Sequence, residues 1–306
     1  MINPNKINRN EECGAALLLT LLVLSLLIVL VGQFSYSVVL DRKVAMNYVH
    51  DAQVSLDIFA GVKAAAGQLS QEGIAGSEGD DVAVKELLLG IGESEITAFI
   101  QQEDSKLNLN SLLNPPQGVS ENEMQQVVER MLKAINTGEI AIPDGLAADI
   151  SQYLNDKGVP ALTLLELTQI QGITEKLLFG SNIGNNSDFE DAFPGLSKYF
   201  TVWSDGLIDY RNADEKLLLS LDAQLNPGIL DVVLKTMENP GKGGQSKLQN
   251  LANRLDRFVK SDSSFFSAVV QSKSGSYARR CMTVFQMKEG TATIILWDEL
   301  EPLEER

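Results

Sequence analysis

The sequence has few histidines, few cysteines and a shortage of basic residues, and each shortage excludes a class of protein. A single histidine, His50, rules out a His-rich metal site and argues against a histidine-based catalytic triad. Cys13 and Cys281 lie near opposite ends of the 306 residues, which excludes a scaffold built on several disulfides. With 25 Lys and Arg against 41 Asp and Glu, the formal net charge of −16 argues against nucleic-acid binding, because phosphate neutralisation needs clustered basic residues.

Charged residues are missing altogether between Cys13 and Leu40. Residues 15–31 read AALLLTLLVLSLLIVLV, and roughly 20 apolar residues suffice to cross a bilayer as a helix. A conventional secretory signal is the alternative, but its apolar stretch is usually about 7–15 residues long. The length of the run therefore favours a retained single-pass membrane anchor.

The helix is predicted to continue past the anchor. Residues 41–69 contain no proline and only isolated glycines, and their apolar side chains recur at helical spacing. This pattern predicts one long helix over residues 15–68, with residues 15–39 spanning the membrane. Its second half is amphipathic, and we expect one face of it to pack against a folded domain.

The rest of the chain predicts an α+β fold. We expect a short helix at residues 82–89, a strand at 96–101 and a short strand at 107–110, followed by an all-helical region. Ser120 with Glu123 has the pattern of a capping box that begins a helix. Residues 199–210 predict a β-hairpin around the turn at residues 204–206. After three helices, at 214–221, 228–237 and 248–260, the segments 265–272, 278–287 and 291–298 predict an antiparallel meander, so that a helical block is inserted into a domain that contains strands.

At the N-terminus a short polar leader ends at Gly14, an uninterrupted apolar helix begins at Ala15, and Leu19 is the fifth residue after the glycine. This arrangement resembles the prepilin signal of minor pseudopilin K of bacterial type II secretion systems. Most pseudopilins carry glutamate at that fifth position, and member K does not. Residues 104–110 (DSKLNLN) resemble the family's segment at the entry to its helical insert, and residues 199–213 resemble its strand pair, with Asp, Arg and Asn in place of the usual Asn, Asn and Thr.

The resemblance implies a division of the chain. Residues 1–14 would be the leader, 15–68 the long helix, 69–104 and 198–306 the pseudopilin core, and 105–197 the inserted helical domain. The implied fold is pilin-like: a long transmembrane helix packed on an antiparallel sheet, with an inserted all-helical domain. A prepilin peptidase would cut between Gly14 and Ala15, and the new amine of Ala15 would be methylated.

The implied function is structural and not enzymatic. The chain would be a minor pseudopilin in the bacterial inner membrane, with its C-terminal domain in the periplasm and with minor pseudopilins I and J as partners. A carboxylate inside a bilayer is costly and needs a partner, and in a pilus-like filament that partner is the N-terminal amine of a neighbouring subunit. Because Leu19 lacks the carboxylate, the chain suits the first subunit, at the tip of the pseudopilus.

Two other functions remain open from the sequence. The same anchor would serve a minor pilin of a type IV pilus, or a membrane-anchored periplasmic binding domain that is never assembled.

No cofactor is expected, except that calcium could be held by the carboxylates of three acidic clusters, Asp80-Asp81, Glu103-Asp104 and residues 188–191. Ser204, Asp205 and His50 offer only weak support for hydrolysis, because no nucleophile-elbow motif accompanies them.

Overall fold

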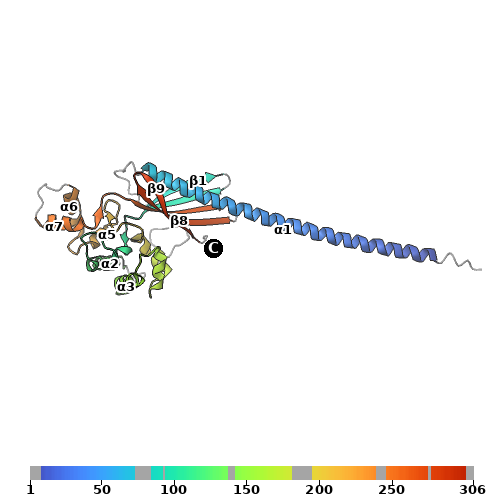
Figure 1. Ribbon diagram of the computed structural model, residues 1–306, viewed down its shortest axis with the longest axis horizontal. Coiled ribbons are helices and arrows are strands. Elements are labelled where there is room, and N and C mark those ends of the chain that lie inside the picture. Colours follow the sequence, from blue (N-terminus) through green and yellow to red (C-terminus); the bar gives the residue numbers. More distant parts are fainter. Residues whose placement is uncertain are drawn as a thin grey trace, which may run out of the picture. The chain divides into compact units, whose positions relative to one another are not determined.

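The computed structural model describes residues 8–72, 84–91, 94–136, 142–180, 195–238, 246–274 and 277–300. The chain divides into two compact units, Met1–Leu56 and Asp57–Arg306. The second unit contains the sheet and all described helices except the greater part of the first (Figure 1).

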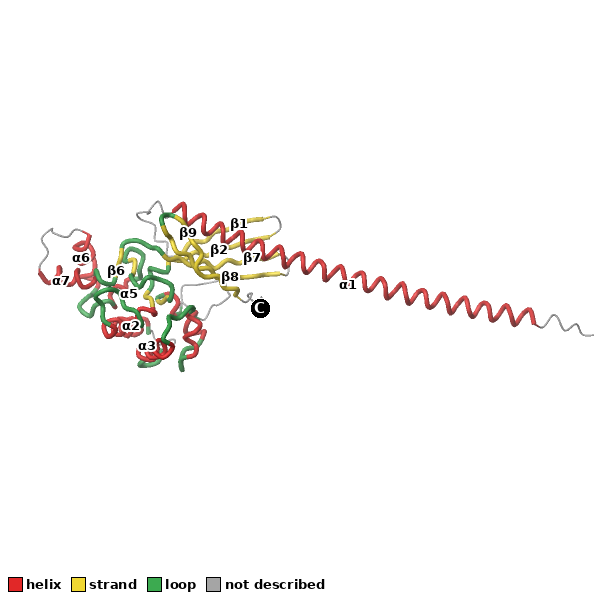
Figure 2. The backbone as a smooth tube through the Cα atoms, in the orientation of Figure 1, coloured by secondary structure: helices red, strands yellow, loops and turns green. Residues whose placement is uncertain are grey.

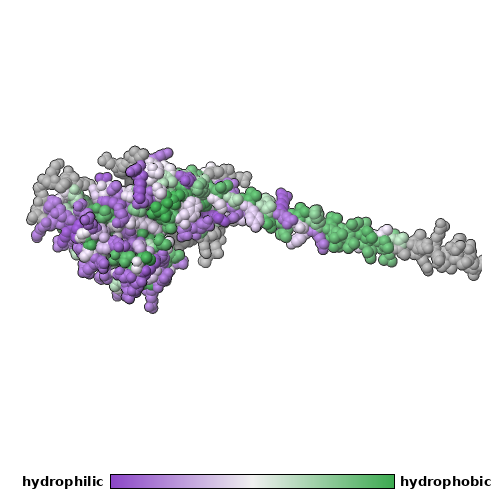
Figure 3. Space-filling view, viewed as in Figure 1, coloured by the Kyte–Doolittle hydropathy of each residue, from purple (hydrophilic) through white to green (hydrophobic). Residues whose placement is uncertain are grey.

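Helix α1 (Asn8–Glu72) begins in the first unit. The side chains of residues 16–40 are all exposed, and Figure 3 shows a nearly continuous hydrophobic surface along this part of the helix. Within this part of the helix the hydroxyl groups of Thr20 and Ser25 donate to the carbonyls of Leu17 and Leu22 at 2.8 Å each. Among the described residues, Ala16–Gln71 is the one helix that is long and apolar enough to span a membrane. These features fit the single-pass anchor expected from the sequence.

The second unit contains a five-stranded antiparallel sheet. Its strands, in spatial order, are β1 (Val84–Ile91), β2 (Ser94–Gln102), β7 (Phe265–Ser274), β8 (Tyr277–Lys288) and β9 (Thr291–Leu300). The closing meander and the strand at 96–101 are thereby confirmed. The helix expected at residues 82–89 is wrong, because this short apolar run pairs with β2 as an edge strand. Periodicity cannot separate a strand from a helix in a run this short.

The last four turns of α1 lie on one face of this sheet (Figure 1). The helix contributes Ile58, Val62, Ala65 and Leu69, which share one face because of their spacing of three and four residues. They form a single buried cluster with side chains from three strands: Ile96, Ala98, Ile100, Ala268, Val270, Cys281 and Phe285. The pilin-like α+β class expected from the sequence is therefore confirmed.

A second apolar cluster holds the helical region together. Its helices are α2 (Glu121–Ile135), α3 (Leu146–Lys157), α4 (Glu175–Phe179), α5 (Glu215–Ser220), α6 (Pro227–Glu238) and α7 (Ser246–Leu255), with 3₁₀ turns η2 (Leu109–Leu112), η3 (Leu164–Gln169) and η4 (Leu196–Lys198). Figure 2 shows these helices gathered apart from the strands of the large sheet. The expected capping box is confirmed, since Ser120 and Glu123 each accept from the other's backbone amide.

The predicted hairpin at residues 199–210 is wrong. Strand β4 (Phe200–Thr201) pairs in parallel with β3 (Leu107–Asn108), and β5 (Ile208–Asp209) pairs in parallel with β6 (Val259–Lys260). Strands β4 and β5 therefore do not pair with each other, and each pairs with a strand that is distant in sequence. The buried cluster of the helical region runs from Leu107 to Val259, past the expected end of the insert at 197; the domain division itself stays a prediction.

The contact between α1 and the sheet gives a matched test at two helical glycines. A Cβ at Gly61 would lie 2.6 Å from Val270 Cγ1 and 2.8 Å from Ile96 Cγ2, whereas one at Gly67 would meet nothing within 4 Å. We expect Gly61→Ala to lower the free energy of unfolding by about 1–3 kcal/mol through overpacking. Gly67→Ala should raise it by up to about 1 kcal/mol, since alanine favours the helix.

Thermal and denaturant unfolding of the full chain in detergent measures both variants. Equal effects of the two substitutions would contradict the close approach at Gly61.

Candidate functional site

The residues of the predicted processing and assembly site lie on one continuous helix. Gly14, Ala15 and Leu19 all fall within α1, and the Leu19 side chain is 66% exposed. The first seven residues of the leader lie outside the described residues. Cleavage after Gly14 and the assembly role of Leu19 stay predictions.

A second candidate site lies where the chain leaves the sheet and returns to it. Strand β2 ends at Gln102 and its neighbour β7 begins at Phe265, so residues 103–264 are inserted between two adjacent strands. The Glu103 amide donates to the Phe265 carbonyl at 2.9 Å and extends the ladder by one bond. Around this crossing the side chains of seven polar residues gather, and we call them the polar junction: Glu103, Asp104, Lys106, Asn108, Thr201, Asp209 and Lys260.

Glu103 joins three elements through one buried carboxylate. Its Oε1 accepts from Lys106 Nζ at 3.0 Å and from the Ser267 hydroxyl on β7, and its Oε2 accepts from the Thr201 hydroxyl on β4. A buried carboxylate is tolerated only with a cation and further donors around it. Glu103 therefore fixes the end of β2 to the helical region.

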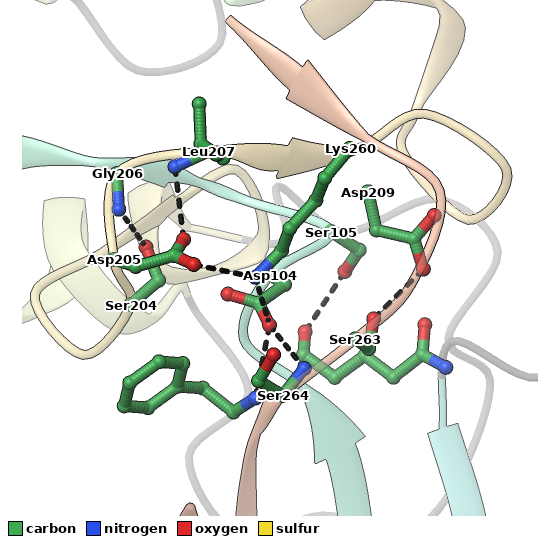
Figure 4. A network of polar contacts seen from close by, with 12 residues as sticks. Asp104, Ser105, Ser204, Asp205, Gly206, Leu207, Asp209, Lys260, Ser263 and Ser264 are labelled. Atoms are coloured by element: carbon green, nitrogen blue, oxygen red, sulfur yellow. Dashed lines mark hydrogen bonds and ion pairs between the residues drawn. The ribbon is translucent and has the colours of Figure 1, made fainter. Parts of the chain in front are cut away.

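Asp104 makes the complementary connection (Figure 4). Its Oδ2 accepts from Lys260 Nζ at 2.9 Å, from the Ser264 amide at 2.6 Å and from the Phe265 amide at 2.9 Å. The Asp104 carbonyl accepts from the Asp209 amide at 2.7 Å. A single residue thus holds both the return of the chain into β7 and the short strand β5.

Burial outweighs the other effects on the pKa of Asp104 but not on that of Lys260. It raises the pKa of Asp104 from its ordinary value of 3.8 to about 6, although the Lys260 ammonium and the Ser264 and Phe265 amides act to lower it. Burial lowers the pKa of Lys260, but hydrogen bonds and charge interactions with Asp104 and Asp205 more than offset this and leave it above its ordinary value.

The two asparagines of the segment 104–110 have separate structural roles. Asn108 Nδ2 donates to the Ser204 carbonyl at 2.7 Å, and its Oδ1 accepts from the Asn110 amide. Asn110 donates to the carbonyls of Ala161 and Val202 and accepts from the Ala161 amide at 2.7 Å. The two side-chain amides therefore pair with backbone groups of loops more than 50 residues away. A leucine has no polar atom, and a serine is too short to reach, so either would leave these backbone groups unpaired.

Ser204 and Asp205, weighed as hydrolytic residues, have structural partners here. The Ser204 hydroxyl accepts from the Gly206 amide at 3.2 Å, and Asp205 Oδ2 lies 3.0 Å from Lys260 Nζ. Both residues therefore contact members of the polar junction, Ser204 through its carbonyl and Asn108, and Asp205 through Lys260. The junction members Thr201 and Lys260 could not be found from the sequence, since no motif links them to Glu103 and Asp104.

The described residues hold no group of three or more His, Cys, Asp or Glu side chains arranged for a metal ion. Both oxygens of Glu103 and Oδ2 of Asp104 accept hydrogen bonds from protein donors, and calcium binding by these two residues stays a prediction. The other two acidic clusters, Asp80-Asp81 and residues 188–191, lie outside the described residues. Calcium binding by the chain stays a prediction.

Comparison with solved structures finds a match over most of the chain. It is with GspK in the crystal structure of the GspK-GspI-GspJ complex from the enterotoxigenic Escherichia coli type 2 secretion system. The match covers 84% of this chain and 99% of that chain, with a TM-score of 0.59 and 13% sequence identity. No protein-family model and no curated protein matches the sequence. The two proteins share a fold.

Loss of the Glu103 carboxylate should destabilise the chain strongly. Glu103→Ala leaves the buried Lys106 ammonium and the Thr201 and Ser267 hydroxyls without their acceptor, and we expect the free energy of unfolding to fall by about 3–5 kcal/mol. Glu129→Ala is the matched control, because Glu129 also pairs with a lysine, Lys133, but on an exposed helix surface.

Denaturant unfolding of the full chain in detergent compares the two variants. Glu129→Ala should leave the midpoint unchanged, and a Glu103→Ala variant as stable as the wild type would show that the junction carries no stability.

Proposed function

We propose, from the fold shared with GspK, that this chain is a minor pseudopilin that caps a type II secretion pseudopilus and supports protein export across the outer membrane. The observation that carries the proposal is the fold match to GspK, which covers 84% of this chain and 99% of the other chain. This chain also has a long apolar N-terminal helix, an antiparallel sheet and a helical region inserted between β2 and β7. No enzymatic activity is part of the proposal.

The tip position is supported by two features of the chain. Leu19 places an apolar side chain where a filament subunit would carry the carboxylate that pairs with a neighbour's amine. The helical region adds a large body to the pilin-like core, and its buried cluster extends from Leu107 to Val259. Such a subunit suits the end of a filament, where it has no neighbour above it.

The proposed location follows from helix α1. Residues 16–40 would lie in the bacterial inner membrane, where 25 residues of helix span about 37 Å, and the unit Asp57–Arg306 would lie in the periplasm. A prepilin peptidase would cut the chain between Gly14 and Ala15 at the inner face of this membrane and expose the amine of Ala15. The proposed partners are the minor pseudopilins I and J of the same secretion system, as in the matched complex of GspK, GspI and GspJ.

The mass of the mature N-terminus tests the processing step. In a host with the prepilin peptidase, we expect the purified chain to begin with N-methyl-alanine at Ala15. Gly14→Val should leave Met1 or its formylated form in place. Gly32→Val, a glycine of the same helix at which a Cβ would meet nothing within 4 Å, should be cut as the wild type is. An uncut wild-type chain would contradict the proposal.

Co-purification tests the proposed partners. A tagged copy of this chain, expressed with untagged I and J of its own secretion system, should retain both in mild detergent. Retention of neither, in cells where I and J themselves form a pair, would exclude the proposed tip complex. If the tagged chain retains I and J while its N-terminus is uncut, the partner contacts form without cleavage after Gly14.

A further inference from the structure

Among the described residues, one oxygen of the Asp104 carboxylate has no hydrogen-bonding partner. The residue is fully buried, and Oδ2 receives all three donors, from Lys260, Ser264 and Phe265. Oδ1 is buried and has no hydrogen-bonding partner among the described residues. A buried carboxylate oxygen without a donor is costly, and binding a proton there removes the buried charge without displacing any of the donors to Oδ2.

The charges of the polar junction favour such a proton. Carboxylates are supplied by Glu103 and Asp104 after the end of β2, by Asp209 on β5 and by Asp205 in the loop before it. Lys106 contacts Glu103, Lys260 contacts Asp104 and Asp205, and the backbone amide of Arg211 donates to Asp209. Lys106 is engaged by Glu103 and Gln101. Lys260 is shared between Asp104 and Asp205. Two carboxylates thus share one ammonium, and of the two Asp104 is buried whereas the Asp205 side chain is 43% exposed.

We propose that Asp104 is a proton-binding site that tightens the connection between the helical region and the sheet as the pH falls. The proton binds Oδ1, and Oδ2 keeps its contacts with Lys260 and with the first residues of β7. When the connection opens and water reaches the carboxylate, the proton is released. This property belongs to the folded chain itself and does not depend on the proposed secretion function.

The direction of the effect follows from linkage. The closed state raises the pKa of Asp104 to about 6 through burial, while a solvated carboxylate titrates near 3.8. The closed state thus binds protons more tightly than the open one, and its advantage grows as the pH falls through 6 toward 3.8. Between pH 7 and pH 5 the equilibrium constant for opening should fall about tenfold.

Hydrogen exchange at the Ser264 and Phe265 amides measures this opening, because both donate to Asp104 Oδ2. In the full chain in detergent, after correction for intrinsic exchange rates, protection of these amides should rise about tenfold from pH 7 to pH 5. Asp104→Asn should remove the pH dependence. Asp205→Asn should retain it, since Asp205 contacts the same ammonium but its side chain is 43% exposed.

A second variant and a direct titration make the test independent of how well Asp104→Asn folds. Lys260→Met removes a cation that holds the pKa of Asp104 down, so the midpoint of the protection change should move to higher pH. Carbon-13 NMR of the wild-type chain labelled at aspartate carboxyls should show one group titrating near pH 6. If every aspartate titrates near 4, or if protection at residues 264 and 265 is constant from pH 7 to pH 5, the proposal is wrong.

Discussion

One constraint underlies the rest of the structure: a long segment is inserted between two neighbouring strands, β2 and β7, which stay hydrogen bonded to each other. Residues 103–264 start and end at the adjacent ends of β2 and β7, where the ladder stops and backbone donors would be left unpaired. Two consecutive carboxylates solve this problem. Glu103 binds side chains of β4 and β7, and Asp104 binds the amides of Ser264 and Phe265, where the chain enters β7, and the ammonium of Lys260. Both acids must be buried to do so, which is why lysines are buried with them.

The two apolar clusters on either side of the junction have different requirements. The cluster between α1 and the sheet has fewer buried residues, and it depends on the close approach of the helix at Gly61 to Val270 and Ile96. The cluster of the helical region is larger and draws on helices and short parallel strand pairs from both halves of the insert. Because neither cluster crosses the junction, the polar contacts there decide how firmly the helical region is held to the sheet.

The sequence predicted the features that are local or periodic. Apolar spacing identified α1, the meander β7–β9 and α2 with its Ser120–Glu123 cap. It failed at residues 82–89, where a run of leucines fits helix and edge strand equally well, and at residues 199–210, where two strand-like segments take distant partners. The polar junction could not be predicted, because Asp104 and Lys260 meet only after the intervening chain has folded.

The proposed function adds a role for each part: an apolar helix as anchor and assembly element, a pilin-like sheet as its support, and a helical region that enlarges the tip. The resemblance at Gly14, Ala15 and Leu19 and the shared fold with GspK are independent lines that point to the same role. The most direct measurement is secretion itself, in the bacterium from which the chain comes. After deletion of its gene, the account predicts that substrates of the type II system accumulate in the periplasm and that a plasmid copy restores their release. Unchanged release of these substrates from the deletion strain would contradict it.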